Sequence, residues 1–272
     1  MIFPRDNAVN AAVLLTFSLA CAFLTSCDVS ASEGSALASS HTTPDPDLHA
    51  EWDRLLKEYV NDGRVDYDTW ARMEQGALKN YLARLGEIDT EKLPKADQLA
   101  FGINLYNASM ILFVMEKRAA NPKWLPTEGD FAVFKEKRIV TKERTISLDD
   151  LEHRVLRPRF KDYRIHAALV CGAESCPKLL PRAYKASDLE EMLDAQMKAF
   201  LSDQDRNRVD ATSRTLHVSS LFDWFKDDFG GEEGVRKILT SHFGDSVKDY
   251  KVEFLPYSWK LNAKKKVLAP IR

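Results

Sequence analysis

The spacing of apolar residues predicts three helices in the first half of the folded region. Residues 48–60 place five large apolar side chains on one helical face, and residues 73–88 predict a second helix. Residues 95–120 are the strongest helix candidate, because apolar side chains surround most of the helix circumference. That pattern is typical of a helix buried in a core, and we expect the domain to form around it.

Later segments combine strand-like and helical patterns. Residues 131–148 alternate apolar and charged side chains, which predicts strands or a hairpin. Residues 148–160 predict a helix that Ser147 caps and Pro158 ends. Further along, the pattern predicts a strand over 164–170, a helix over 186–201, a short strand leading into a helix over 215–229, and a late strand over 247–259.

These elements predict one α+β domain over residues 48–272. No internal repeat and no Gly/Ser-rich linker divides this region, and the chain's 44% of hydrophobic residues can supply one core. We expect the core helix to pack on a small, mainly antiparallel sheet. The net charge of −2 and the pI near 6.3 give no general argument for nucleic-acid binding.

The N-terminus has the pattern of an export signal. The apolar run over residues 11–25 suits a signal-peptide core but is short for a bilayer span. It ends in Leu-Thr-Ser-Cys27, which resembles a bacterial lipobox. We therefore expect a lipoprotein signal peptide over residues 1–26 and a lipid on Cys27; a plain secretory signal or an uncleaved anchor is the alternative.

Residues 27–47 predict a flexible tether, because they are rich in Ser, Ala, Thr and Pro and poor in large apolar residues. The expected location is the cell envelope, on the periplasmic face of the inner or outer membrane. There the protein would contact the membrane through its N-terminal lipid.

Export changes the interpretation of the cysteines. Cys21 would leave with the signal peptide and Cys27 would carry lipid, so only Cys171 and Cys176 remain as thiols. An oxidising compartment favours a disulfide between them.

Two asparagines on the core helix are candidates for a site. Asn104 and Asn107 are three residues apart and share a helical face. Asparagine is unfavourable inside a helix and needs partners when buried. Either the two amides bond to loop backbone and fix tertiary structure, or they orient a catalytic histidine or a substrate amide.

A second group of candidates follows Ser147. Glu152 and His153 point about 100° apart on a helix, so they do not pair with each other, whereas Asp149 and His153 are spaced to meet. A carboxylate can fix the tautomer of a histidine and stabilise its charged form. A surface helix of mixed charge is the alternative.

The segment "IHAALVCGAESCP" permits three interpretations. In a regular strand His166 and Cys171 face opposite sides, but Gly172 suits a turn that re-aims the loop. The cysteines form a disulfide, or one acts as a thiol nucleophile beside His166 or His153, or Cys171, Cys176, His166 and His153 bind zinc. Apart from that zinc, no cofactor is expected, since no nucleotide-binding loop or zincin motif is present.

Together the blocks "FGINLYNA", "ISLDDLEHRVLR", "RIHAALVCGAESCPKLLPRAY", "VSSLFDWFKDDF" and "FLPYSWKLN" resemble the domain of unknown function 547 family, in family order. The resemblance implies that the polar residues of these blocks meet in one cleft. One departure is Gly102, where the family more often carries a bulky aromatic residue, so we expect open space beside the core helix.

The leading hypothesis is a Cys/His-dependent hydrolase or acyl-transferase acting on an amide in a peptide-like or small-molecule substrate. Cys176 is the first candidate nucleophile because its loop is freer, and Cys171 the second. His153 or His166 would be the base, Glu152 or Asp149 would orient it, and the two asparagines would position the substrate. The alternatives are a non-catalytic binding module with a Cys171–Cys176 disulfide, and a zinc-dependent hydrolase.

Overall fold

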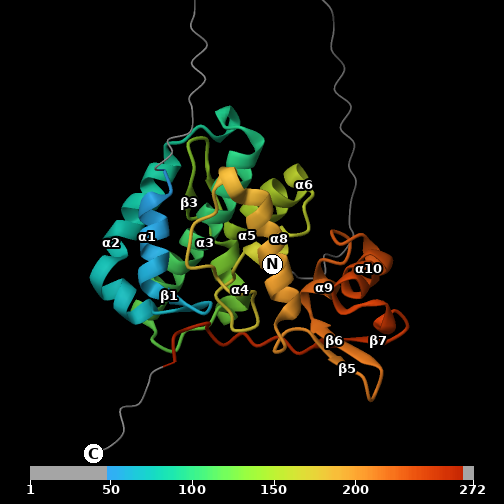
Figure 1. Ribbon diagram of the computed structural model, residues 1–272. Helices are drawn as coiled ribbons and strands as arrows, with labels where there is room; N and C mark the ends of the chain where they lie inside the picture. The colour runs from blue at the N-terminus through green and yellow to red at the C-terminus, as the bar shows by residue number, and fades with distance from the viewer. Residues whose placement is uncertain (1–47, 266–272) are drawn as a thin grey trace, which may run out of the picture.

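The computed structural model describes residues 48–265, and Figure 1 shows their arrangement. The predicted signal peptide, tether and Cys27 lie outside the described residues, as do residues 266–272.

A single long helix forms the centre of the fold. Helix α3 (Lys95–Ala120) is buried along its whole middle, from Leu99 to Met115, so the predicted core helix is confirmed. It packs against α2 (Tyr67–Gly86), which begins earlier than predicted because the Asp66 side chain caps it at Thr69 N. Helix α1 (Ala50–Tyr59) covers α2, as in Figure 1.

The segment after α3 combines a short hairpin with a helix that contains a π-helical stretch. Ser147 and Asp150 form a capping box, which confirms the predicted helix start. The prediction that Pro158 ends the helix is wrong: it lies in the first turn of α6, where no backbone N–H is required. The elements are η1 (Thr90–Lys92), α4 (Glu128–Lys135), β3 (Ile139–Val140), β4 (Thr145–Ile146), α5 (Leu148–Asp150), the π-helical η2 (Leu151–Leu156) and α6 (Arg157–Phe160).

The strand predicted over residues 164–170 is wrong. Residues Ile165–Ala168 form one helical turn, α7, and all four side chains are buried. A turn buried on every side and a strand buried on both faces give the same continuous apolar run. The alternation argument that separated His166 from Cys171 therefore does not apply.

The C-terminal part contains the larger sheet. Strand β6 pairs with β5 in antiparallel fashion and with β7 in parallel fashion. The parallel pairing is possible because two helices and a 3-10 turn connect β6 to β7. The elements are η3 (Ala186–Asp188), α8 (Leu189–Ser202), β5 (Arg208–Asp210), β6 (Thr215–Ser219), α9 (Leu221–Trp224), α10 (Gly231–Phe243), η4 (Asp245–Val247) and β7 (Lys251–Leu255).

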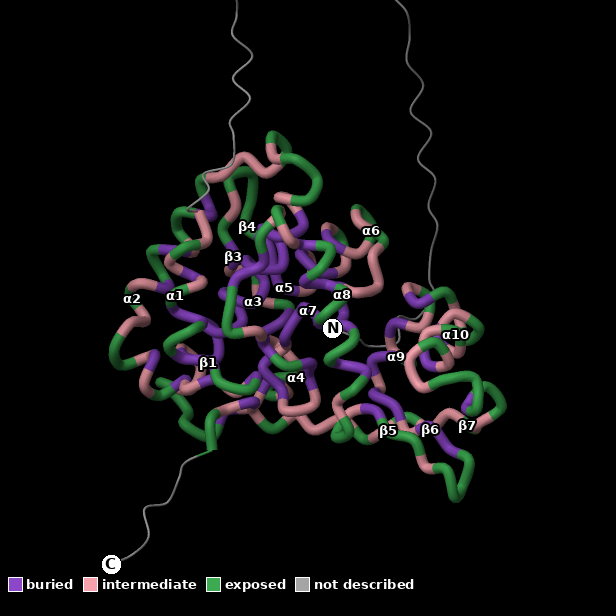
Figure 2. Tube along the Cα trace, viewed as in Figure 1, coloured by how far each residue is buried: buried purple, intermediate pink, exposed green. Residues whose placement is uncertain are grey.

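The buried apolar residues form two clusters, and Figure 2 marks the buried positions along the chain. The larger cluster surrounds α3, and the smaller one joins β6, α9, α10 and one face of α8. Tyr257 packs against both. The fold combines helices with small, mainly antiparallel sheets, which confirms the α+β class. The core helix does not pack on a sheet as predicted. Helix α3 is surrounded by helices, and the three-stranded sheet belongs to the smaller cluster.

A strap of residues 256–264 runs from β7 back to the N-terminal helices (Figure 1). Its backbone bonds to the cysteine loop through Asn262 N–H to Gly172 O, and to β2 (Arg64–Val65) through Val65 N–H to Asn262 O. Tyr67 also donates its hydroxyl proton to Asn262 Oδ1 at 2.8 Å. The strap therefore links the C-terminal part of the described region to β2, α2 and the cysteine loop.

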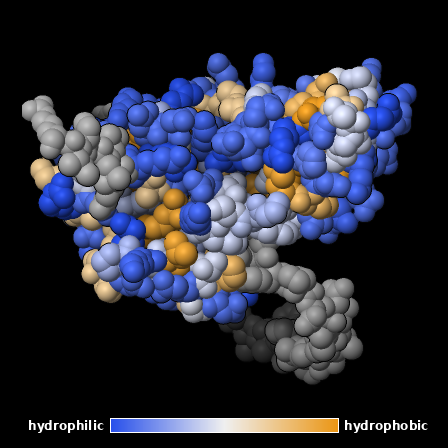
Figure 3. Space-filling view, turned by 90° about the horizontal axis from the view of Figure 1, so that it is seen from below, coloured by the Kyte–Doolittle hydropathy of each residue, from blue (hydrophilic) through white to orange (hydrophobic). Residues whose placement is uncertain are grey.

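Among residues 48–265, α3 is the one helix long and apolar enough to cross a membrane, and nearly all of it is buried by the rest of the protein. Seen from below, the surface is mostly hydrophilic, with apolar residues gathered in a few patches (Figure 3).

Gly102 on α3 lies against Leu156 of η2, and any side chain at this position would overlap with it. Both residues line a groove of about 250 Å³ between α3, the β3–β4 hairpin and α6. Open space therefore does exist beside the core helix, although Leu156 fills the part closest to Gly102.

Candidate functional site

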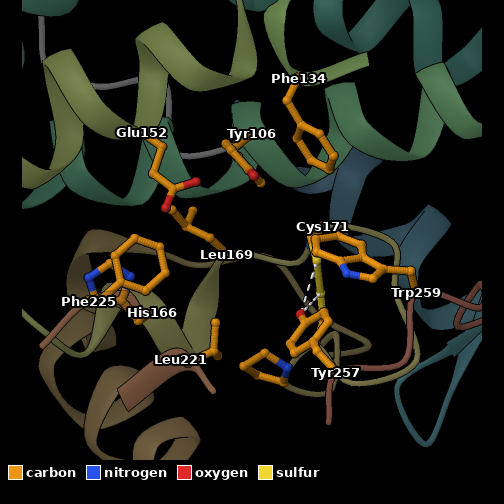
Figure 4. A pocket seen from close by; sticks show the side chains of 12 residues that line it. Tyr106, Phe134, Glu152, His166, Leu169, Cys171, Leu221, Phe225, Tyr257 and Trp259 are labelled. Carbon is orange, nitrogen blue, oxygen red and sulfur yellow. Dashed lines mark hydrogen bonds between the residues drawn. A yellow bond between two sulfur atoms is a disulfide. The ribbon is translucent and has the colours of Figure 1, made fainter. Parts of the chain in front are cut away.

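A small pocket lies where the two hydrophobic clusters meet, and Figure 4 shows its walls. Its volume of about 30 Å³ has room for one or two water molecules. It collects candidates from two of the sequence blocks. The lining residues are Tyr106, Phe134, Glu152, His166, Leu169, Cys171, Cys176, Pro177, Leu221, Phe225, Tyr257 and Trp259.

Glu152 brings a buried carboxyl group into the pocket. Burial raises the pKa of Glu152 above its ordinary value, although the charge of nearby His166 and a hydrogen bond with Tyr106 reduce the shift. The residue projects from the π-helical segment η2, a kind of distortion that is frequent at functional sites. A carboxyl group that keeps its proton can donate it to a bound molecule.

His166 is held in one orientation by two contacts. Its Nε2 lies 2.7 Å from Oδ2 of Asp228, and its ring stacks on Phe225 with centroids 3.7 Å apart. Arg157 donates two hydrogen bonds to the same carboxylate, from Nε at 2.6 Å and Nη2 at 3.0 Å. Burial alone would raise the pKa of Asp228, but the bonds from His166 and Arg157 hold it well below its usual range.

The two cysteines form a disulfide in the pocket wall. Cys176 is only 2% exposed, whereas Cys171 is partly exposed. The expectation that Cys176 lies in the freer part of the loop is therefore wrong, because its side chain belongs to the larger cluster. As bonded sulfurs, neither is a free thiol in this structure.

The cysteine loop is fixed on several sides. Gly172 has a φ of +78°, which confirms the predicted turn, and the space where a side chain would begin is closed by Met110 and Val114. Arg206 donates hydrogen bonds to the carbonyl oxygens of Glu174 and Cys176, each at 2.7 Å. The loop is therefore shaped by its neighbours as well as by the disulfide.

Asn104 and Asn107 bond to backbone outside the pocket lining. Asn107 donates to Ala168 O and accepts from Val170 N–H, both at 2.9 Å. Asn104 likewise donates to Tyr184 O and accepts from Tyr184 N–H, and it also accepts a hydrogen bond from the Trp52 indole. These contacts match the structural alternative for both residues: they clamp the cysteine segment at its two ends.

His153 lies outside the pocket lining. Its Nδ1 is 2.9 Å from Arg157 Nη1, and together they line an outer depression that also includes Asp228. The structure thus brings together Glu152, His166 and the cysteines, and places His153 outside the lining, beside Arg157 and Phe225.

The described residues provide no set of ligands for the zinc site that the sequence offered as an alternative. Among residues 48–265, no group of three or more His, Cys, Asp or Glu side chains is placed to hold a metal ion. The two sulfurs are bonded to each other, and His153 and His166 face different hollows.

Sequence reasoning missed three polar members of the site. Asp228 anchors His166, Tyr106 bonds to Glu152, and the Tyr257 hydroxyl lies 3.2 Å from Cys176 Sγ and 3.3 Å from Cys171 Sγ. Each lies inside one of the blocks that carry the family resemblance. The blocks were thus a signal for them, although nothing in the spacing pointed to these particular side chains.

One comparison with known proteins found a match to the central part of the chain. The searches of curated proteins and of solved structures found no match. A family model described as "Protein of unknown function, DUF547" matches residues 90–201, which include Glu152, His166 and both cysteines. This match supports assignment of that region to the domain of unknown function 547 family.

Proposed function

We propose that the reduced protein is a thiol-dependent hydrolase or acyl-transferase acting on an amide in a peptide-like or small-molecule substrate. The observation that carries the proposal is the pocket that Cys171 and the buried His166 both line, with Asp228 bonded to His166 from outside the lining. Cys171 is the nucleophile, because it is the more exposed of the two cysteines.

The His166–Asp228 pair supplies the base. With Nε2 bonded to Asp228, the other ring nitrogen, Nδ1, remains to take the proton of the Cys171 thiol. The ionised Asp228 stabilises the imidazolium that forms, and Arg157 keeps Asp228 ionised. Of the two candidate bases, His166 is therefore the one that we assign to this role.

Glu152, which also lines the pocket, supplies a proton donor. Its raised pKa favours the protonated form, which can bond to a substrate carbonyl oxygen or protonate the leaving nitrogen. The close-fitting aromatic walls exclude bulk water, and that strengthens each of these polar interactions.

Reduction is required before this chemistry begins, since the nucleophilic sulfur is bonded to Cys176 in the oxidised form. The disulfide also favours a second candidate function, a non-catalytic binding module in which the fixed loop shapes the ligand site. In that case the oxidised protein is the functional form.

Alkylation and turnover of the reduced protein test the proposal. After reduction, iodoacetamide should label Cys171 first at neutral pH, and a library of p-nitroanilide amides should be cleaved in reductant but not without it. Cys171→Ala should abolish turnover, whereas Cys176→Ala should retain it and remove the need for reductant. Turnover that persists in Cys171→Ala would refute the thiol mechanism, and ligand binding restricted to the oxidised protein would favour the binding module.

A further inference from the structure

The two sulfurs of the disulfide differ in how far they can be reached. Cys176 is 2% exposed and packed into the larger cluster, whereas Cys171 is partly exposed at the pocket wall. Thiol–disulfide exchange begins when an external thiolate attacks one of the two sulfurs, so access decides which one. Attack is therefore directed to Cys171 Sγ.

The two sulfurs also differ in how well they can leave. Sγ of Cys176 accepts a hydrogen bond from the Cys171 backbone N–H at 3.1 Å and from the Tyr257 hydroxyl at 3.2 Å. Hydrogen bonds to a thiolate lower the pKa of its thiol, and a thiol of lower pKa leaves faster. The donors that the Cys176 thiolate needs are in place before the disulfide opens.

Tyr257 is well suited to remain a donor. Its ring contacts Trp224 and Trp259, with centroids 4.7 and 4.8 Å apart, so the hydroxyl is held beside the sulfurs. Burial raises the pKa of Tyr257 well above its usual range, which keeps the hydroxyl protonated. The Tyr257 hydroxyl can donate its hydrogen bond to either sulfur, because it also lies 3.3 Å from Cys171 Sγ.

We propose that Cys171 and Cys176 form a thiol–disulfide exchange site that oxidises external thiols, with Cys171 as the attacked sulfur and Cys176 as the leaving group. The external thiolate bonds to Cys171 Sγ, the Cys171–Cys176 bond breaks, and its electron pair stays on Cys176, which then takes a proton from solvent. A second external thiolate attacks the external sulfur of the mixed disulfide and releases Cys171 as a thiolate. Two thiols are thereby oxidised to one disulfide, and the protein disulfide is reduced by two electrons.

This activity does not depend on amide turnover, although its reduced product is the form that the proposed hydrolase requires. The two proposals can therefore fail separately. Exchange is measured with thiols alone, and turnover is measured on protein reduced in advance.

The test uses reduced glutathione as the probe. Oxidised protein is mixed with glutathione, quenched with acid at intervals, and mapped by peptide mass spectrometry. We expect the mixed disulfide on Cys171, and opening roughly ten-fold slower in Tyr257→Phe, because one hydrogen bond to a charged group is lost. Tyr163→Phe, which removes a hydroxyl outside the pocket lining, should open at the wild-type rate.

A mixed disulfide divided equally between the two cysteines, or a Tyr257→Phe rate equal to wild type, would overturn the proposal. A second pair of variants gives a result even if Tyr257→Phe fails to fold. Cys176→Ser should react with Ellman's reagent at Cys171 much faster than Cys171→Ser reacts at Cys176. Equal rates in these two folded variants would also refute the assignment of attacked and leaving sulfurs.

Discussion

His166 and Asp228 are 62 positions apart in the chain, yet Nε2 of one lies 2.7 Å from Oδ2 of the other. His166 belongs to the helical turn α7, and Asp228 follows α9 in the C-terminal part. The pair therefore forms only when the two parts of the fold are assembled, and the orientation of the imidazole depends on both.

Replacing the anchor of His166 should disable the thiol chemistry. In Asp228→Asn the imidazole loses the charge that stabilises its protonated form, so kcat of the reduced protein should fall by roughly a hundred-fold or more, with a smaller change in KM. Turnover of p-nitroanilide amides measures it. Asp227→Asn, at the exposed neighbouring position, is the matched control, and equal activity of the two variants would remove Asp228 from the mechanism.

Glu152 should make stability fall as the pH rises. Its pKa is raised by folding, so between the unfolded pKa of about 4.3 and the higher folded pKa the native state holds more protons than the unfolded state. The free energy of unfolding should therefore decrease with increasing pH above about 4.3. In Glu152→Gln, this contribution to the decrease of the free energy of unfolding with pH should be absent. Urea unfolding between pH 4.5 and pH 8 measures it.

A matched variant separates this effect from the titration of other groups. Glu191→Gln changes an exposed carboxyl group on α8 and should reproduce the wild-type pH dependence. If Glu152→Gln also reproduces it, the carboxyl group is ionised in the folded protein at neutral pH and does not serve as a proton donor.

Asn107 should act on stability rather than on substrate. Asn107→Ala leaves the Ala168 carbonyl and the Val170 N–H without their partner, so the free energy of unfolding should fall by about 3 kcal/mol. Chemical denaturation measures the loss. Asn80→Ala, at an exposed position of α2, should change it by less than about 0.5 kcal/mol. A stable but inactive Asn107→Ala would instead assign the amide to substrate.

The membrane anchor that the sequence predicts is testable by labelling. Cells supplied with a radiolabelled fatty acid should incorporate it into the wild-type protein but not into Cys27→Ser, which should leave the membrane fraction on washing. Cys21→Ser is the control, since this cysteine lies within the predicted signal peptide. Label retained in Cys27→Ser would place the lipid elsewhere.

The sequence predicted those elements whose pattern is local. The bounds of α3 and the cap at Ser147 followed from apolar spacing and from side chains that bond within one turn. The turn α7 was mistaken for a strand because burial on all sides removes the periodicity that distinguishes the two. Pro158 was misjudged because the helix changes from π-helical to α-helical geometry at Arg157, and Pro158 lies in the first turn of the α-helical part.

The site was predictable to the extent that its residues are close in sequence. Glu152, His166 and the cysteines carry recognisable chemistry in neighbouring blocks, whereas Asp228 and Tyr257 come from distant parts of the chain. Their roles depend on tertiary contacts, and no spacing rule connects residues 62 or 81 positions apart. The choice between Cys171 and Cys176 likewise required their burial to be known.

The strap of residues 256–264 imposes an order on the maturation of the protein. Tyr257 lies 86 positions after Cys171, so both thiols leave the ribosome well before the residue that covers them. During that interval the sulfurs are open to any oxidant or thiol that the nascent chain meets. Once the strap is in place Cys176 is buried, whereas Cys171 stays partly exposed, so any later change of redox state begins at Cys171.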